Sequence, residues 1–175
     1  FRNLRPLIET HDPDKVYFVL EGRPTFRNDL SGGNYKSNRK SRGEKFHRQK
    51  AAIINIIRSC FPFTSVRHPD LECDDTIASL AIKHCKQGDA CTVVSSDSDF
   101  LQLLNLNHDI KLYHPIKKKF LEKPSYDYVT WKALRGDATD NIKGIPGVGD
   151  KTALKLVSDP VRLNEFLLDE NKKSI

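Results

Sequence analysis

Residues 90–99 read ACTVVSSDSD. The first five of them form a short apolar and β-branched run, which predicts a buried strand. Asp97 and Asp99 follow directly and alternate in what we expect to be a loop. In open parallel sheets, functional groups gather beyond the carboxyl ends of the strands. The stretch therefore predicts an α/β protein that carries acidic side chains at one edge of its sheet.

The regions on both sides repeat this alternation of strands and helices. Apolar runs predict further strands at 15–20 and 110–113, and apolar residues at helical spacing predict helices over 44–60 and 74–85. Because strands lead into helices, we expect a mostly parallel sheet flanked by helices. After about residue 125 the pattern becomes helical and hairpin-like, which indicates a small second unit.

The composition limits the class of protein. The 175 residues are 38% hydrophobic and 30% charged, with a mean hydropathy of -0.55. No apolar stretch approaches the ~20 residues of a membrane helix, and no apolar leader opens the chain, so we expect a cytoplasmic protein without a membrane partner. The cysteines lack zinc-type spacing, and we expect free thiols at Cys60, Cys73, Cys85 and Cys91.

The positive charge is concentrated in one block. The net charge is +6 with a pI near 9.1, and residues 27–50 hold only Asp29 and Glu44 as acids. Taken alone, such a run is typical of a solvated face. Beside acidic clusters it favours a nucleic-acid partner, since Lys and Arg neutralise phosphates. The basic residues of the block are Arg27, Lys36, Arg39, Lys40, Arg42, Lys45, Arg48 and Lys50.

Carboxylates also gather away from the 90–99 stretch. Concentrated carboxylates repel one another unless a cation lies among them, and oxygen ligands without paired imidazoles or thiolates favour Mg²⁺ or Mn²⁺. The chain therefore has the pattern of a metal-dependent enzyme that acts on nucleic acid. The candidate ligands at strand ends and at the helix start are Glu21, Glu72, Asp74, Asp75, Asp97 and Asp99.

Several of these acids have a simpler interpretation when they are considered singly. Asp74 and Asp75 also suit a helix N-terminus, and a third acidic pair, Asp137 and Asp140, also suits a turn or a cap. An EF-hand is disfavoured at residues 97–101, because leucine stands at the fifth position and the required glycine is absent.

A glycine hairpin follows the third acidic pair. Residues 144–149 read GIPGVG and lead into DKTA at 150–153, which predicts a tight turn whose amides meet a helix N-terminus. Such a turn contacts nucleic-acid backbones without reading bases. A P-loop is disfavoured because Asp150 stands where lysine is required. We expect phosphate contacts from Gly147, Gly149, Lys151 and Thr152.

These motifs together resemble the 5′-nuclease family of flap endonucleases, which includes bacteriophage 5′-exonucleases and the 5′-nuclease domains of bacterial DNA polymerases. The resemblance covers nearly the whole chain and is carried by residues 22–27, 35–39, 72–75, 96–99 and 136–153. It implies a PIN-like nuclease core over 1–125, with a basic arch at about 27–50. A helix-three-turn-helix DNA-binding region over 126–175 completes the expected organisation.

The resemblance also implies a reaction and its residues. The reaction is two-metal hydrolysis of phosphodiesters in branched or 5′-ended DNA or RNA–DNA, with ions roughly 4 Å apart. Lys36 and Arg39 fall on the arch residues that engage the scissile phosphate, and a potassium ion would lie near Val148. Further DNA contacts are expected from Arg27, Tyr35 and Lys40. The implied metal ligands are Glu72, Asp74, Asp75, Asp97, Asp99, Asp137 and Asp140, with Glu21 in a position where many members carry aspartate.

The wider context is expected to be a monomer in a bacterial or phage-infected cytoplasm, alone or beside a DNA polymerase. The chain starts at Phe1 and has no methionine, so we expect a piece of a longer protein whose first family aspartate precedes Phe1. The main alternative is a catalytically impaired DNA-binding scaffold of the same fold. A haloacid-type phosphatase also uses Asp-x-Asp after a strand, but Leu101 stands where its threonine is needed.

Overall fold

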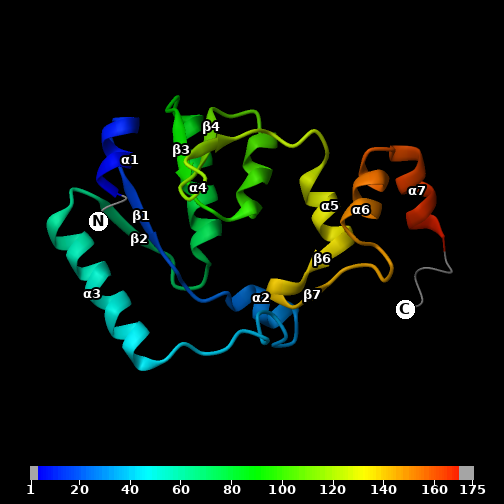
Figure 1. Ribbon diagram of the computed structural model, residues 1–175, viewed down its shortest axis with the longest axis horizontal. Helices are drawn as coiled ribbons and strands as arrows, with labels where there is room; N and C mark the ends of the chain where they lie inside the picture. The colour runs from blue at the N-terminus through cyan, green and yellow to red at the C-terminus, as the bar shows by residue number, and fades with distance from the viewer. Residues whose placement is uncertain (1–3, 170–175) are drawn as a thin grey trace. The chain divides into compact units, whose positions relative to one another are not determined.

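The computed structural model describes residues 4–169, which separate into two compact units (Figure 1). The first unit comprises residues 4–25 and 40–76, and the second comprises residues 26–39 and 77–169. The boundary falls inside helix α4 (Cys73–Lys86), so the acidic first turn of this helix belongs to the first unit. Each unit is described separately below.

The first unit is built around two parallel strands. Strand β1 (Tyr17–Leu20) pairs with β2 (Thr64–Arg67), and the two strands lie side by side in Figure 1. Helix α1 (Leu4–His11) precedes β1, and helix α3 (Glu44–Cys60) leads into β2. Because the strands are parallel, Glu21 and the loop after β2 start from the same edge of the pair.

These elements confirm the predicted strand at 15–20 and the predicted helix at 44–60. Strand β2 was not predicted, because its four residues, TSVR, carry only one strongly apolar side chain. Its pairing with β1 compensates for this weak local preference.

The second unit contains a three-stranded sheet. Strands β3 (Cys91–Val94) and β4 (Ile110–His114) are parallel, and β5 (Lys119–Leu121) pairs antiparallel with β4. The 3₁₀ helix η1 (Ser98–Asn105) connects β3 to β4. The main core is formed by Ala81, Val93, Phe100, Leu103, Ile110 and Leu112.

The structure confirms an α/β chain with parallel strand pairs, including the predicted strands at 90–94 and 110–113 and the helix at 74–85. It adds a detail that the sequence did not indicate: the strands belong to a two-stranded and a three-stranded sheet. The connection from β3 to β4 is a 3₁₀ helix rather than an α-helix.

The second unit continues into the predicted helical and hairpin-like region, with a second core of Leu134, Val148, Ala153 and Leu156. Its elements are α5 (Tyr128–Arg135), β6 (Gly136–Asp137), η2 (Ala138–Asp140), β7 (Ile142–Lys143), α6 (Asp150–Val157) and α7 (Pro160–Leu168). The small helix α2 (Thr25–Leu30) precedes a turn-rich segment, of which residues 31–39 also belong to this unit.

Two glycines close the short β6–β7 hairpin. Gly136 has a φ of 73°, and a Cβ built on it would lie 2.2 Å from the backbone nitrogen of Gly144. A Cβ on Gly144 would lie 2.2 Å from the carbonyl carbon of Arg135. Only glycine permits this close approach of two backbones. The hairpin therefore holds the short 3₁₀ helix η2 in place, with Asp137 at its N-cap and Asp140 at its end.

Two further expectations concern the cysteines and the membrane. Cys60, Cys73, Cys85 and Cys91 are free thiols, as predicted. Within residues 4–169, every helix is too short or too polar to cross a bilayer.

Candidate active site

The first unit gathers four predicted metal ligands around the start of α4. Glu21 follows β1, and its Oε2 accepts a hydrogen bond of 3.4 Å from the backbone N–H of Cys73. Glu72 is buried, with 4% of its surface exposed, and immediately precedes α4. Asp74 and Asp75 lie in the first turn of that helix, as predicted. The structure therefore brings Glu21 to the chain segment that holds the other three carboxylates.

A tight backbone contact produces this arrangement. A Cβ built on Gly22 would lie 2.0 Å from the carbonyl oxygen of His68 and 2.2 Å from that of Leu71. The neighbouring N–H of Arg23 donates to the carbonyl of Pro69 at 2.9 Å. The segment after β1 thus lies directly on the loop between β2 and α4, and only glycine fits at the contact.

Cys73 lies among these carboxylates as a neutral group. Burial raises the pKa of its thiol, and a hydrogen bond with Glu21 and the negative charges of Asp74 and Glu21 raise it further. Its Sγ donates to Asp74 Oδ1 at 3.3 Å. The thiol therefore remains protonated and acts as a hydrogen-bond donor, which agrees with a site of oxygen ligands.

In the second unit, Asp97 and Asp99 occupy the loop after β3. Asp97 caps η1, and its Oδ1 accepts a hydrogen bond of 2.9 Å from the backbone N–H of Asp99. Asp97 is exposed to solvent, whereas Asp99 is half-buried. The hydroxyl of Tyr128 donates to Asp99 Oδ1 at 3.4 Å. Both carboxylates follow the strand as predicted, and only Asp99 is enclosed by protein side chains.

Lys132 links Asp99 to Asp137. Its ammonium contacts Asp99 Oδ1 and lies 2.9 Å from Asp137 Oδ2. Burial alone would lower the pKa of Lys132, but hydrogen bonds to the two carboxylates outweigh burial and raise it. Burial would likewise raise the pKa of Asp137, but the hydrogen bond and charge of Lys132 lower it. Lys132 and Asp137 are therefore both ionised at neutral pH.

The sequence interpretation missed Lys132. In the sequence it is an ordinary helix lysine four residues after Tyr128, and its partner Asp99 lies 33 residues earlier in the chain. Both side chains contact Asp99 from α5.

Asp140 contacts the predicted arch residues. Its carboxylate accepts hydrogen bonds from the Tyr35 hydroxyl at 3.0 Å and from Arg39 Nη2 at 2.5 Å, and Lys36 Nζ lies 3.8 Å away. Asp137 caps the same turn through its hydrogen bonds to the two backbone N–H groups of residues 139 and 140. The structure therefore brings two predicted catalytic cations to a predicted metal ligand 101 residues away from Arg39.

Backbone contacts hold the 31–39 segment in place. The N–H of Lys36 donates to the carbonyl of Asp140 at 3.0 Å, and the side-chain amide of Asn38 donates to the carbonyl of Ala138 at 2.9 Å. Lys36 itself has a φ of 55°, a left-handed conformation that is uncommon for a non-glycine residue. Such conformations persist where surrounding contacts enforce them, and they concentrate at functional sites.

The glycine hairpin has the predicted geometry. Gly147 has a φ of 76°, and α6 begins after Gly149 with no side-chain cap among the described residues. Lys151 and Thr152 lie exposed in the first turn of this helix. The buried Val148 belongs to the second core of the unit and anchors the turn. The N-cap residue Gly149 therefore offers no side-chain hydrogen bond to the first amides of α6.

The remaining predicted DNA contacts lie elsewhere on the basic block. Arg27 is half-buried in α2, and Lys40 is exposed on the segment that leads to α3.

The predicted metal ligands form two groups, one in each unit. Glu21, Glu72, Asp74 and Asp75 form the first group, and Asp97, Asp99, Asp137 and Asp140 form the second. Across residues 4–169, no three or more His, Cys, Asp or Glu side chains are arranged around a common metal position. Carboxylate donors do suit a hard divalent ion, so the chemistry of the ligand set fits the predicted metals.

Two family models together match nearly the whole chain. Residues 1–133 match the family model of the 5'-3' exonuclease N-terminal resolvase-like domain. The chain belongs to the 5′-3′ exonuclease family. Residues 123–174 match the C-terminal SAM fold of the 5'-3' exonucleases. The family fold consists of a resolvase-like, PIN-like domain followed by a helical domain. This is the fold predicted from the sequence.

Among curated family members, the 5'-3' exonuclease of Buchnera aphidicola is 34% identical over 168 residues, covering 90% of this chain and 54% of the relative. The thermostable DNA polymerase I of Thermus aquaticus is 34% identical over 176 residues, covering 94% of this chain and 21% of the polymerase. The chain thus spans about half the length of the first relative and about a fifth of the second.

Solved structures show the same fold. A bacteriophage T5 5'-exonuclease with bound zinc ions has a TM-score of 0.71 and 18% identity, covering 95% of this chain and 69% of that chain. A T5 flap endonuclease in complex with DNA and metal ions has a TM-score of 0.69 and 19% identity, covering 90% of this chain and 64% of that chain.

Proposed function

We propose that this 5′-3′ exonuclease family member is a structure-selective 5′-nuclease. It hydrolyses phosphodiesters of branched or 5′-ended DNA or RNA–DNA with two divalent ions. The observation that carries the proposal is the contact of Lys36 and Arg39 with Asp140. This contact places two cationic side chains beside a carboxylate, and cleavage of a phosphodiester needs both positive charge for the phosphate and oxygen ligands for a metal.

The proposed metal ligands divide by position. Glu72, Asp74 and Asp75 together with Asp97 hold the ion pair, and Glu21 acts through water. Asp99, Asp137 and Asp140 fill outer or second-ion positions. When bound, Mg²⁺ or Mn²⁺ ions activate water and stabilise the leaving oxygen. Support comes from solved T5 relatives that were crystallised with metal ions or bind zinc ions.

The cationic side chains orient the phosphate in this proposal. Lys36 and Arg39 hold the scissile phosphate, and in the absence of substrate both cations contact the Asp140 carboxylate. Their positive charge stabilises the negative charge of the phosphate.

The nucleic acid is held over a wider surface. Arg27, Tyr35 and Lys40 contact the strand near the arch, and the glycine hairpin contacts the duplex backbone. A potassium ion near Val148 would support the hairpin. A DNA complex of a T5 flap endonuclease supports DNA as the substrate. The proposed hairpin contacts are Gly147, Gly149, Lys151 and Thr152.

The proposed organisation is a nuclease core over 1–125 followed by a DNA-binding region over 126–175, acting as a monomer in the cytoplasm of a bacterium or of a phage-infected cell. Several curated relatives are DNA polymerase I, which supports a polymerase as a partner or as an attached domain.

The test is cleavage of a labelled 5′-flap duplex with Mg²⁺ and with chelator. Asp97→Ala is expected to abolish cleavage and leave DNA binding largely intact. Asp89→Ala is the matched control, because Asp89 precedes the same strand and its side chain is 59% exposed. Normal cleavage by Asp97→Ala would refute the assignment. Metal-independent binding without any cleavage by the unmodified protein would favour the impaired DNA-binding scaffold.

A second variant tests the arch. Lys36→Ala is expected to slow cleavage of the flap, since it removes positive charge from the scissile phosphate. Lys83→Ala removes an equal charge from an exposed position of α4, outside the basic block, and serves as its control. A Lys36→Ala protein with unchanged turnover would contradict this role.

A further inference from the structure

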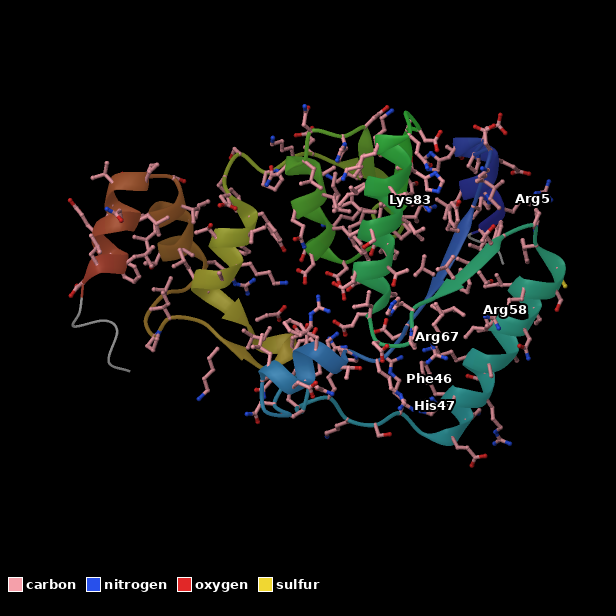
Figure 2. The ribbon with its side chains drawn as sticks, turned by 180° about the vertical axis from the view of Figure 1, so that it is seen from behind. Arg5, Phe46, His47, Arg58, Arg67 and Lys83 are labelled. Carbon is pink, nitrogen blue, oxygen red and sulfur yellow. The ribbon has the colours of Figure 1, made fainter. Side chains whose placement is uncertain are left out.

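The first unit contains a shallow cavity. None of the proposed metal ligands lines this cavity. It has a volume of about 330 Å³ and is lined by Arg23, Arg67, Pro69 and Asp70. Arg67 is the last residue of β2, and Figure 2 labels it. The volume falls within the range of ligand pockets.

The two arginines of this cavity have no structural partner within residues 4–169. Neither guanidinium makes a hydrogen bond or an ion pair there, although Asp70 lines the same cavity. Asp70 instead accepts a hydrogen bond of 3.4 Å from the Thr25 hydroxyl. Arginines that serve a structural role normally pair with a carboxylate in a fixed geometry. Two guanidinium groups against one carboxylate leave the cavity with a net positive charge.

The backbone fixes both arginines in place. Leu20 and Arg67 are partners in the register of β1 and β2, and the N–H of Arg23 donates to the carbonyl of Pro69 at 2.9 Å. Gly22 lies against the same loop, where an added Cβ would meet the carbonyl oxygens of His68 and Leu71. The backbone positions of Arg23 and Arg67 are therefore set by the fold, and their exposed side chains extend from these positions.

The position of the cavity relates it to the proposed active site. Arg23 follows Glu21 by two residues, and the loop that carries Pro69 and Asp70 leads directly into Glu72. Both acids belong to the same unit as the cavity and are proposed metal ligands. A nucleic-acid strand that reaches these carboxylates therefore passes next to the two arginines.

We propose that this cavity binds an internal phosphodiester of the substrate strand, next to the one that is cleaved. The planar guanidinium group suits phosphate oxygens and can bind them through two hydrogen bonds. The inference rests on the proposed nuclease function and adds a substrate subsite to it.

The test compares Arg67→Gln and Arg23→Gln with Arg58→Gln. Arg58 lies at the end of α3 in the same unit, is exposed, and is labelled with Arg67 in Figure 2. Binding of a 5′-flap duplex is measured by fluorescence anisotropy in chelator over a series of salt concentrations. Each cavity variant is expected to weaken binding about tenfold and to reduce the salt slope by about 1, as for the loss of one phosphate contact. Arg58→Gln is expected to leave both values unchanged.

Several results would overturn the proposal. One is that both cavity variants bind the flap duplex with the same affinity as Arg58→Gln, while their melting temperatures show that all three variants are folded. Another is a loss confined to substrates with a 5′-phosphate and absent with a 5′-hydroxyl, which would indicate a terminal phosphate instead. Cleavage by the unmodified protein in Mg²⁺ is measured in parallel. If the unmodified protein does not cleave the flap, the result counts against the proposed function. The difference in binding between the cavity variants and Arg58→Gln decides the subsite.

Discussion

Replacing Lys132 by methionine should destabilise the second unit measurably. The change removes the ammonium that contacts Asp99 and Asp137 and retains an unbranched apolar side chain of similar length. Two carboxylates would then remain close to each other without the cation between them. Their side chains are 34% and 18% exposed, and that of Lys132 is 22% exposed, so solvent screens the repulsion only in part.

The magnitude follows from this intermediate burial. An exposed ion pair contributes roughly 0.2–1 kcal/mol, whereas removing one partner of a buried pair costs about 3–5 kcal/mol. For the partly exposed triad we expect the free energy of unfolding to fall by about 2 kcal/mol. In a chain of this size, 1 kcal/mol shifts the melting temperature by roughly 2–4 °C, so Lys132→Met should melt about 4–8 °C lower.

The effect should depend on pH in a defined direction. The pKa of Asp137 is lowered from 3.8 in the folded chain, so its contribution is present above pH 3.8 and is lost as the pH falls through the folded pKa. The pKa of Lys132 is raised from 10.5, so its contribution is present below pH 10.5 and is lost as the pH rises through the folded value. The difference between the two proteins should therefore be full at pH 7 and small near pH 2.

The assay is thermal unfolding followed by circular dichroism in chelator at pH 7 and near pH 2. Lys155→Met is the control, because Lys155 is exposed on α6 and the substitution removes the same charge. Equal melting temperatures for Lys132→Met and Lys155→Met at pH 7 would refute the reasoning. An equal deficit at both pH values would also refute it, since the loss would then come from packing rather than charge.

Three further outcomes are expected. Asp140→Asn should speed hydrogen exchange in residues 31–39, because its carboxylate is their main charged anchor; exchange equal to that of the unmodified protein would contradict this. Gly22→Ala should lower the melting temperature, because its Cβ would lie 2.0 Å from a carbonyl oxygen, and an unchanged melt would show that the loop yields freely. Burial is the main cause that raises the pKa of Cys91 to about 11, and a hydrogen bond with the neighbouring thiol of Cys85 is the next largest. With roughly one thiol in a thousand ionised at pH 8, Cys91 should react with iodoacetamide far more slowly than the exposed Cys60, as peptide mass spectrometry can measure; equal rates would contradict it.

The elements that were predicted correctly have strong local signals. The strand at 91–94 is β-branched, and helix α3 has the predicted bounds because its apolar residues recur at helical spacing. The position of the acids after strands could also be predicted, because the end of a strand is a local property. The glycine hairpin at 144–149 could be predicted from its closely spaced glycines, of which Gly147 has a left-handed backbone that favours glycine.

The features that were missed depend on contacts between distant residues. Strand β2 has a weak local pattern and forms because it pairs with β1. Lys132 resembles any exposed helix lysine in the sequence, and its role comes from a partner 33 residues earlier in the chain, Asp99. Arg67 is similar: a single basic residue at the end of a short strand gives no signal, and only the fold places it in a cavity with Arg23.

Several acids of the second unit are paired with internal cations. Asp99 and Asp137 share Lys132, and Asp140 pairs with Arg39. Each internal cation offsets a repulsion that would otherwise destabilise the unit. If a divalent ion binds these carboxylates as proposed, it exchanges with an ammonium or a guanidinium. The displaced Arg39 then becomes available to a phosphate, so that metal binding and substrate binding at this part of the unit would favour each other.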